Sequence, residues 1–218
     1  KPTGLDLDEP QRVADAVQAM GIRHAVITSV DRDDLRDGGA AIFAATITAI
    51  HRQVSSCQVE VLTPDFQGVE SSLRTVMESS PEIFNHNIET VPRLFPRVRP
   101  KSLYQRSLGV LRLAGEMATG SKTKSGLMVG LGESMDEVKQ VLVDLREQGV
   151  QLVTVGQYLR PSLKHIRCER FWHPDEFAEV REYGNSLGFA HIESGPLVRS
   201  SYHAHEQAAA GAAASARG

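Results

Sequence analysis

A regular alternation of short apolar runs and helical stretches constrains the fold of this chain more than any other feature. The runs are rich in β-branched residues and nearly continuous, as is typical of strands covered on both faces of a parallel sheet. The predicted strands are 24–30, 59–66, 82–89, 125–131, 152–159 and 189–193, and the predicted helices are about 9–20, 40–54, 69–79, 101–118, 135–148 and 174–187. This alternation predicts right-handed βαβ units. A barrel, a part-barrel and an open doubly wound sheet all remain open at this point.

The ends of the predicted helices carry recognisable signals. Asp8 and Ser134 stand where an N-cap side chain would accept a backbone hydrogen bond, and acidic residues follow Ser134 at the positive end of its helix. Gly21, Gly149 and Gly188 each stand where a helix must stop before a strand.

Composition narrows the class of protein. The chain has 218 residues, 41% of them hydrophobic and 23% charged, and its formal charge of −3 argues against a nucleic-acid or membrane-surface role based on bulk electrostatics. No apolar run approaches the roughly 20 residues that span a bilayer. We therefore expect a cytoplasmic protein. Cys57 and Cys168 are too far apart for a CxxC metal site and are interpreted as incidental thiols.

Polar side chains gather at the carboxyl ends of five of the predicted strands, in the segments 28–34, 63–66, 85–90, 130–133 and 157–161. In parallel α/β folds the ligand binds at these carboxyl ends. Alternate residues of a strand share a face, so Asn85, Asn87 and Glu89 are predicted to point the same way, inward in a barrel. Two amides and a carboxylate need partners there, and this predicts a polar ligand. No GxGxxG run follows the first strand and there is no phosphate-binding loop.

A dense polar run, Arg199-Ser200-Ser201-Tyr202-His203-Ala204, follows the last predicted strand. An arginine, two hydroxyls, a tyrosine and a histidine could bind a phosphate, orient a peptide or ligate a metal. A strand end followed by a hydrogen-bonded turn explains the same run without any ligand. The run by itself does not decide between these alternatives.

Several runs together resemble the lipoyl synthase family of the radical S-adenosylmethionine superfamily. They occur in the family's order, and the resemblance extends from Lys1 to about His205. The matching segments are 59–66 (VEVLTPDF), 84–91 (FNHNIETV), 98–100 (VRP), 125–133 (SGLMVGLGE), 156–159 (GQYL) and 194–204 (SGPLVRSSYHA). The Asn-His-Asn run is also similar to that of biotin synthase, a related sulfur-inserting enzyme.

The resemblance implies a partial TIM-type (β/α)6 barrel whose first strand is missing from this chain. It implies a sulfurtransferase of lipoate biosynthesis with two [4Fe-4S] clusters and S-adenosylmethionine, which inserts sulfur at C6 and C8 of an octanoyl group. That group is carried by a lipoyl carrier protein or domain, and an electron donor is required. Ser201 maps onto the family's hydroxyl ligand of the second, auxiliary cluster. Asn87 and Glu89 map onto residues that contact the ribose of S-adenosylmethionine.

The chain departs from the family in lacking both cysteine motifs, C-x3-C-x2-C and C-x4-C-x5-C. One interpretation is that it is the C-terminal portion of an active enzyme, inactive alone, whose cysteines and first strand lie before Lys1. The alternatives are a non-catalytic barrel fragment that binds S-adenosylmethionine or a carrier protein, and a cluster-independent barrel enzyme acting on phosphates. Residues 1–205 are predicted to form the part-barrel and residues 206–218 a disordered Ala-rich tail. Arg160 replaces the family's usual Gln and is predicted to alter a hydrogen bond near the substrate channel.

Overall fold

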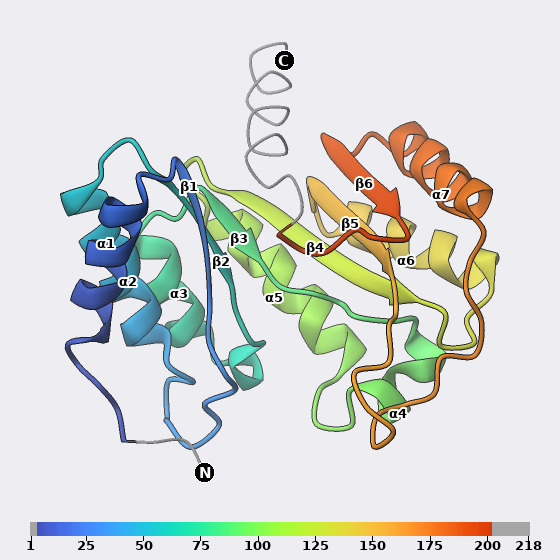
Figure 1. Ribbon diagram of the computed structural model, residues 1–218, viewed down its shortest axis with the longest axis horizontal. Coiled ribbons are helices and arrows are strands. Elements are labelled where there is room, and N and C mark those ends of the chain that lie inside the picture. The colour runs from blue at the N-terminus through green and yellow to red at the C-terminus, as the bar shows by residue number, and fades with distance from the viewer. Residues whose placement is uncertain (1–3, 202–218) are drawn as a thin grey trace.

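The computed structural model describes residues 4–201, which form a curved sheet of six parallel strands backed by helices (Figure 1). The strands are β1 (His24–Thr28), β2 (Gln58–Leu62), β3 (Ile83–Asn85), β4 (Lys122–Val129), β5 (Leu152–Gln157) and β6 (His191–Gly195). The α-helices are α1 (Glu9–Met20), α2 (Ala40–Gln53), α3 (Glu70–Glu78), α4 (Phe95–Val98), α5 (Tyr104–Met117), α6 (Met135–Glu147) and α7 (Pro174–Ser186). Two short 3-10 helices, η1 (Phe66–Gly68) and η2 (Pro92–Leu94), complete the described chain.

The strand order in the sheet is the order along the chain, from β1 to β6. Right-handed crossovers between successive neighbours place every connecting helix on the same face of the sheet, whereas a doubly wound sheet reverses its order. Figure 1 shows the helices along the convex side. The predicted α/β part-barrel is therefore confirmed, and the sheet remains open with β1 and β6 at its edges. The strand expected before Lys1 lies outside this sequence.

Apolar side chains fill the layer between sheet and helices in two clusters. One contains Ile47, Val61 and Leu73, and the other contains Leu127, Leu142, Val153 and Phe177. All of these side chains are at most 3% exposed. The opposite, concave face of the sheet is thus left to carry polar side chains. Within residues 4–201, no helix is both long and apolar enough to cross a bilayer.

Helix boundaries agree with the sequence-based prediction to within three residues at every end, and α1 occupies the predicted range. Ser134 caps α6 as expected, because its hydroxyl accepts from the Glu137 N–H and the Glu137 carboxylate accepts from the Ser134 N–H. Gly21 ends α1 in the left-handed conformation, at φ 63°. The expectation for Asp8 is wrong, since its side chain makes no capping hydrogen bond to α1.

The largest error of the sequence-based prediction concerns the strand at 82–89, because the ladder of β3 stops at Asn85. The hydroxyl of Ser125 takes the place of ladder bonds there: it donates to the carbonyl of His86 (2.8 Å) and accepts from the N–H of Ile88 (3.1 Å). The chain rejoins β4 through an isolated bridge between Glu89 and Leu127. This interruption shapes the site described below. The short helices η1, η2 and α4 were also not predicted. Residues 202–218, including the predicted tail, lie outside the described residues.

The capping box of α6 predicts a pH-dependent contribution to stability. The Arg93 guanidinium, 2.8 Å from the Glu137 carboxylate, and the Ser134 N–H lower the pKa of Glu137 to about 2. A lowered folded-state pKa contributes stability above the ordinary value of about 4.3, and this stability is lost as the pH falls toward 2. Glu137→Gln should therefore cost roughly 0.5 kcal/mol at pH 7. Urea unfolding of the full-length protein at pH 7, 4 and 3 should show this difference shrinking; a constant difference would contradict the assignment.

Candidate functional site

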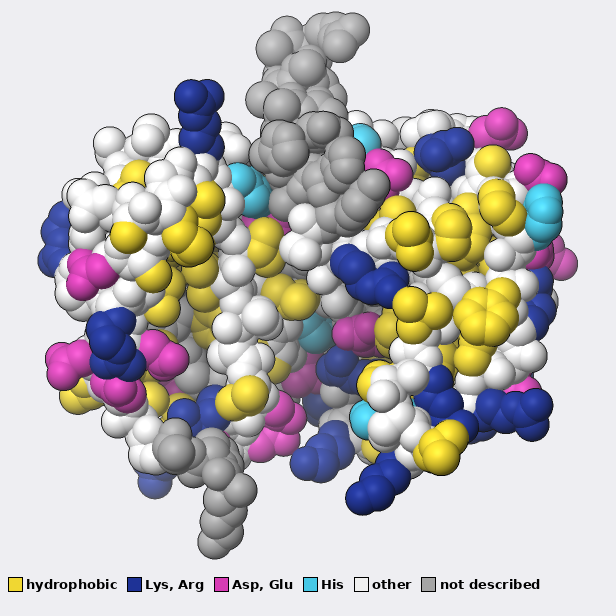
Figure 2. Space-filling model, in the orientation of Figure 1, with side chains coloured by type: hydrophobic (Ala, Val, Ile, Leu, Met, Phe, Trp, Pro, Cys, Tyr) yellow, Lys and Arg dark blue, Asp and Glu magenta, His cyan; other side chains and the backbone are white. Residues whose placement is uncertain are grey.

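Two adjoining pockets occupy the concave face at the carboxyl ends of the strands. The first, of about 410 Å³, is lined by residues that follow β1, β2 and β3 and by the segment 98–102. The second, of about 230 Å³, lies between β4, β5 and the segment 198–200. Asn87 and Glu89 line both pockets. Figure 2 shows the molecule hollowed between its two halves on this side. The predicted convergence of polar strand ends is thus confirmed for β1, β2, β3 and β5.

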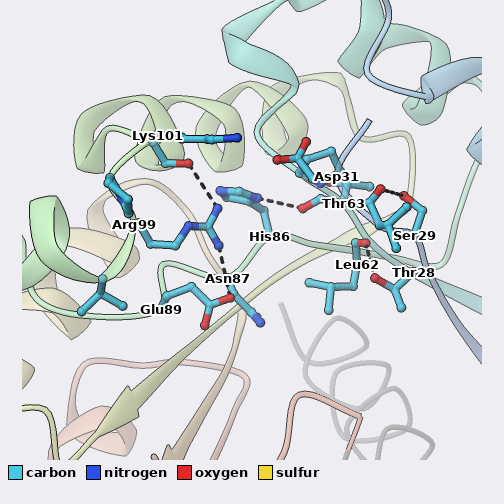
Figure 3. Close-up of a pocket in the computed structure, with 15 residues that line it drawn as sticks. Thr28, Ser29, Asp31, Leu62, Thr63, His86, Asn87, Glu89, Arg99 and Lys101 are labelled. Atoms are coloured by element: carbon cyan, nitrogen blue, oxygen red, sulfur yellow. Dashed lines mark hydrogen bonds and ion pairs between the residues drawn. The ribbon is translucent and has the colours of Figure 1, made fainter. Parts of the chain in front are cut away.

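Glu89 lies at the junction of the two pockets in an unusual backbone conformation. Its φ of 68° is in the left-handed region, which costs free energy for a residue with a side chain and tends to occur at functional sites. Its N–H donates to the carbonyl of Gly126, and its carboxylate lies 3.4 Å from the Arg99 guanidinium (Figure 3). Burial raises the pKa of Glu89, against the opposing charge of Arg99. Glu89 is therefore a carboxylate held in the pocket with one cationic partner.

Asn87 places an amide beside Glu89. Its Oδ1 is buried and accepts no hydrogen bond within the described residues. A Cβ added at Gly126 would lie 2.9 Å from this oxygen, so glycine on β4 leaves the space that the amide occupies. In Figure 3, Asn87 and Glu89 lie on one side of the pocket, and Thr28 and Ser29 lie on the other. An unpaired acceptor and a carboxylate together suit a ligand that presents neighbouring hydroxyl groups.

Asn85 faces the same side of the sheet as Asn87, but it lies one layer deeper and lines neither pocket. Its side chain is fully buried and donates to the Glu60 carboxylate of β2 at 2.8 Å. His86, of the opposite parity, lines the first pocket instead. Its Nδ1 lies 2.9 Å from the carbonyl of Thr63 (Figure 3) and its Nε2 lies 3.0 Å from the Ser107 hydroxyl.

Ser201 is the last described residue and stands at the end of a segment that folds back over the sheet. Its side chain is exposed. Behind it, Val198 is buried, and its carbonyl would lie only 2.3 Å from a Cβ added at Gly156 of β5. Glycine at 156 therefore permits the segment to approach β5 closely. Ser201 is thus held near the second pocket, while the rest of the predicted run, Tyr202 to Ala204, lies outside the described residues.

Comparison with known proteins decides the family. The pattern that defines the Radical SAM superfamily matches residues 1–145. The chain is 54% identical over 206 residues to the lipoyl synthase of Halalkalibacterium halodurans, covering 94% of this chain and 68% of that protein. This chain belongs to the lipoyl synthase family. It is also 60% identical over 207 residues to the lipoyl synthase of Rubrobacter xylanophilus, covering 95% of this chain. It spans 64% of the length of that protein.

Solved structures share the fold at low sequence identity. HydG, described as a maturase of the [FeFe]-hydrogenase, superposes with a TM-score of 0.66 and 14% identity, covering 84% of this chain and 43% of HydG. SuiB of Streptococcus suis gives a TM-score of 0.63 at 11% identity, covering 84% of this chain and 41% of SuiB. At such identities these neighbours bear on the fold of this lipoyl synthase family member and on nothing further.

The radical SAM assignment implies S-adenosylmethionine and a [4Fe-4S] cluster, and the chain fits these two groups differently. The free Oδ1 of Asn87 and the Glu89 carboxylate fit the hydroxyl groups of S-adenosylmethionine. Thiolates for a cluster are not provided: Cys57 is buried in the core, and Cys168 contacts Gln157 at 3.6 Å. Within residues 4–201, no group of three metal-ligating side chains gathers. The described residues thus offer acceptors that suit ribose hydroxyl groups, but they offer no set of thiolates for a cluster.

One expectation about this lipoyl synthase family member needs correction. The fourth polar strand end does not face the pockets, because the buried Glu133 carboxylate accepts from the N–H groups of Gly130 and Leu131 in its own loop.

Arg160 lines neither pocket, although its neighbours Leu159 and Pro161 line the second. Its guanidinium donates to the carbonyls of Leu163 and His165 in the loop between β5 and α7. The altered hydrogen bond near the substrate channel stays a prediction.

Sequence reasoning did not identify the cations of the first pocket, Arg99 and Lys101. Arg99 was noticed only as part of the family resemblance, and Lys101 was placed at the start of a predicted helix that begins, in the structure, at Tyr104. Asp31 also lines this pocket, and burial together with the neighbouring Asp33 raises the pKa of its carboxyl group.

Proposed function

We propose that this chain is the barrel portion of a lipoyl synthase that inserts two sulfur atoms at C6 and C8 of a protein-bound octanoyl group. The proposal rests on one observation above all: the chain is 60% and 54% identical to two lipoyl synthases over 95% and 94% of its length. Because the chain spans 64% of the Rubrobacter protein, the activity is proposed for the full-length protein. Residues 1–205 would form its part-barrel and 206–218 a disordered tail.

Asn87 and Glu89 would hold the ribose of S-adenosylmethionine. The Glu89 carboxylate and the unpaired Oδ1 of Asn87 are both acceptors, and the two ribose hydroxyls are donors. Arg99 keeps Glu89 in place by its ion pair. S-adenosylmethionine held there would supply the radical that abstracts hydrogen from the octanoyl chain. The second pocket, on the far side of Glu89, would receive the octanoyl group.

Two [4Fe-4S] clusters would complete the enzyme. Their cysteines would come from a part of the full-length protein outside this chain, since the chain contains only Cys57 and Cys168. Ser201 would add a hydroxyl ligand to the auxiliary cluster. Oxygen is a weaker partner than thiolate for iron in such clusters, which suits an iron atom that must leave when sulfur is given up. An octanoylated carrier protein and an electron donor would be the partners, in the cytoplasm.

The experiment that tests this function uses the full-length protein. Translation of the gene upstream of Lys1 should reveal the motifs C-x3-C-x2-C and C-x4-C-x5-C. After anaerobic reconstitution with iron and sulfide, the protein should convert an octanoyl-lysyl peptide to the lipoyl form with S-adenosylmethionine and dithionite. A start codon at the position of Lys1, or cleavage of S-adenosylmethionine without sulfur insertion, would instead favour the non-catalytic fragment or another radical reaction.

The assignment of Glu89 makes a separate prediction. Glu89→Gln should weaken S-adenosylmethionine binding about tenfold, because hydrogen bonds to a charged acceptor are worth more than those to an amide. Equilibrium dialysis with the full-length protein measures this change. Glu78→Gln, at an exposed position near the end of α3, serves as the matched control and should bind as the parent does. Equal affinity of the Glu89 variant and the parent would remove Glu89 from the site.

A further inference from the structure

A buried ion pair lies beneath the two pockets, in the middle of the parallel sheet. Lys124 of β4 and Glu60 of β2 are both 0% exposed, and the Lys124 Nζ lies 3.0 Å from Oε1 and 3.1 Å from Oε2 of Glu60. Lys124 and Gly126 are two residues apart on β4 and so face the same side of the sheet. Since Gly126 abuts Asn87, which lines both pockets, the ion pair lies one layer below the pockets.

Polar neighbours from two other strands complete the surroundings of Glu60. Asn85 of β3 donates to its Oε1 at 2.8 Å, and the His24 Nε2 of β1 lies 3.6 Å from its Oε2. Burial opposes ionisation of Glu60, but His24, Lys124 and Asn85 together hold its pKa below the ordinary value. Burial lowers the pKa of Lys124, and the charge of Glu60 opposes this shift. Four strands thus contribute one side chain each to a compact charged cluster.

The ammonium group of Lys124 has a third N–H, which makes a hydrogen bond outside the charged cluster. It donates to the backbone carbonyl of Ser200 at 2.6 Å, 76 residues away in sequence. Figure 1 shows the segment that follows β6 crossing β5 toward β4. The close approach of the Val198 carbonyl to Gly156 is a second contact on the same path. The segment is therefore fixed at two points, and the residue after the second point is Ser201.

We propose that Lys124, held by Glu60, is a positioning residue that fixes the Ser200 carbonyl and thereby places the Ser201 hydroxyl beside the second pocket. The placement rests on the proposed function only in that Ser201 is taken as a cluster ligand; the anchor itself is independent of it. The geometry of the ion pair is consistent with this role. Glu60 and Asn85 fix the position of the ammonium group from the sheet side, and the remaining N–H points at the incoming segment.

A purely stabilising role does not account for this arrangement. A buried ion pair is often no more stabilising than a well-packed apolar pair of the same volume, so its retention calls for another reason. The apolar layer on the convex face already provides the core of the sheet. What an apolar side chain at 124 could not provide is a hydrogen bond to a backbone carbonyl on a segment that has no ladder partner there.

The test uses the full-length protein and the neutral double variant Lys124→Met/Glu60→Gln, which removes the anchor without leaving a buried charge. Hydrogen exchange on the iron-free protein reports the anchor alone. The amides of Arg199 to Ser201 should exchange about tenfold faster, whereas those of β4 should be unchanged. Gly156→Ala, which displaces the segment while Lys124 remains, should produce the same local change. Unchanged exchange at 199–201 in the double variant would overturn the proposal.

A second measurement connects the anchor to the cluster. In the reconstituted double variant, Mössbauer spectra should show a reduced fraction of oxygen-ligated iron, while S-adenosylmethionine binding by Asn87 and Glu89 is retained. Lys139→Met, which breaks a lysine–glutamate pair on the outer helices, and Gly109→Ala, which meets no atom within 4 Å, are the controls and should match the parent. If the parent itself lacks oxygen-ligated iron, the proposed function fails while the exchange result still stands. Parent-like spectra with faster exchange would overturn the positioning role.

Discussion

Replacing Lys124 alone with methionine is expected to lower the free energy of unfolding by about 3–5 kcal/mol, because the Glu60 carboxylate is then left buried without its cation. Both side chains are 0% exposed, so water cannot replace the lost partner without opening the sheet. Adding Glu60→Gln to this variant should recover most of the loss, since a neutral amide costs far less to bury than a charge. Urea unfolding of the parent, the two single variants and the double variant gives the coupling between the sites.

The matched control is a lysine–glutamate pair of similar length at the surface. Lys139 Nζ lies 2.6 Å from the Glu179 carboxylate, and the two side chains are 27% and 53% exposed. Lys139→Met should cost less than about 1 kcal/mol, as is usual for exposed pairs. A Lys124→Met variant as mild as this control, or a double variant as unstable as the single one, would show that the buried charge is not what the lysine neutralises.

The sequence predicts the helices of this protein better than its strands, and the reason is that helix ends are local. Ser134 and Glu137 specify the start of α6 within four residues, and Gly21 ends α1 by its own conformation. Strand 82–89 depended on alternation alone. In the structure β3 ends at Asn85, where the hydroxyl of Ser125 bonds to the backbone of His86 and Ile88. Ser125 is distant in sequence, so no local pattern predicts this contact.

Some residues of the candidate site could likewise be predicted from the sequence, and others could not. Asn87 and Glu89 were predicted from their alternate positions near the end of strand 82–89 and from the family resemblance, and the structure brings them together in one pocket. The cluster around Glu60 and Lys124 was not predicted, although Glu60 stands as a lone charge between apolar residues of its strand. A lone charge in a buried strand needs a partner, but 64 residues separate these two, so only the strand order can pair them. This is a general limit of reasoning from local periodicity.

Ser201→Ala should separate the two halves of the proposed reaction. The variant should still cleave S-adenosylmethionine within about twofold of the parent, because Asn87 and Glu89 are untouched, while lipoyl product falls about tenfold or more. Mass spectrometry of the octanoyl-lysyl peptide and of 5′-deoxyadenosine measures both from one reaction mixture. Ser186→Ala, an exposed serine at the end of α7, is the matched control and should give parental amounts of both.

Ser200→Ala removes the Ser200 hydroxyl but leaves the Ser200 backbone carbonyl in place. This variant keeps the carbonyl that accepts from Lys124, and it should lose less product than Ser201→Ala. The Lys124→Met/Glu60→Gln variant removes that anchor but keeps both hydroxyls, and it should fall between the two. This order follows from a ligand at 201 whose position is set by the backbone at 200. Equal losses from Ser200→Ala and Ser201→Ala would mean that the turn as a whole, and not the Ser201 hydroxyl, supports sulfur insertion.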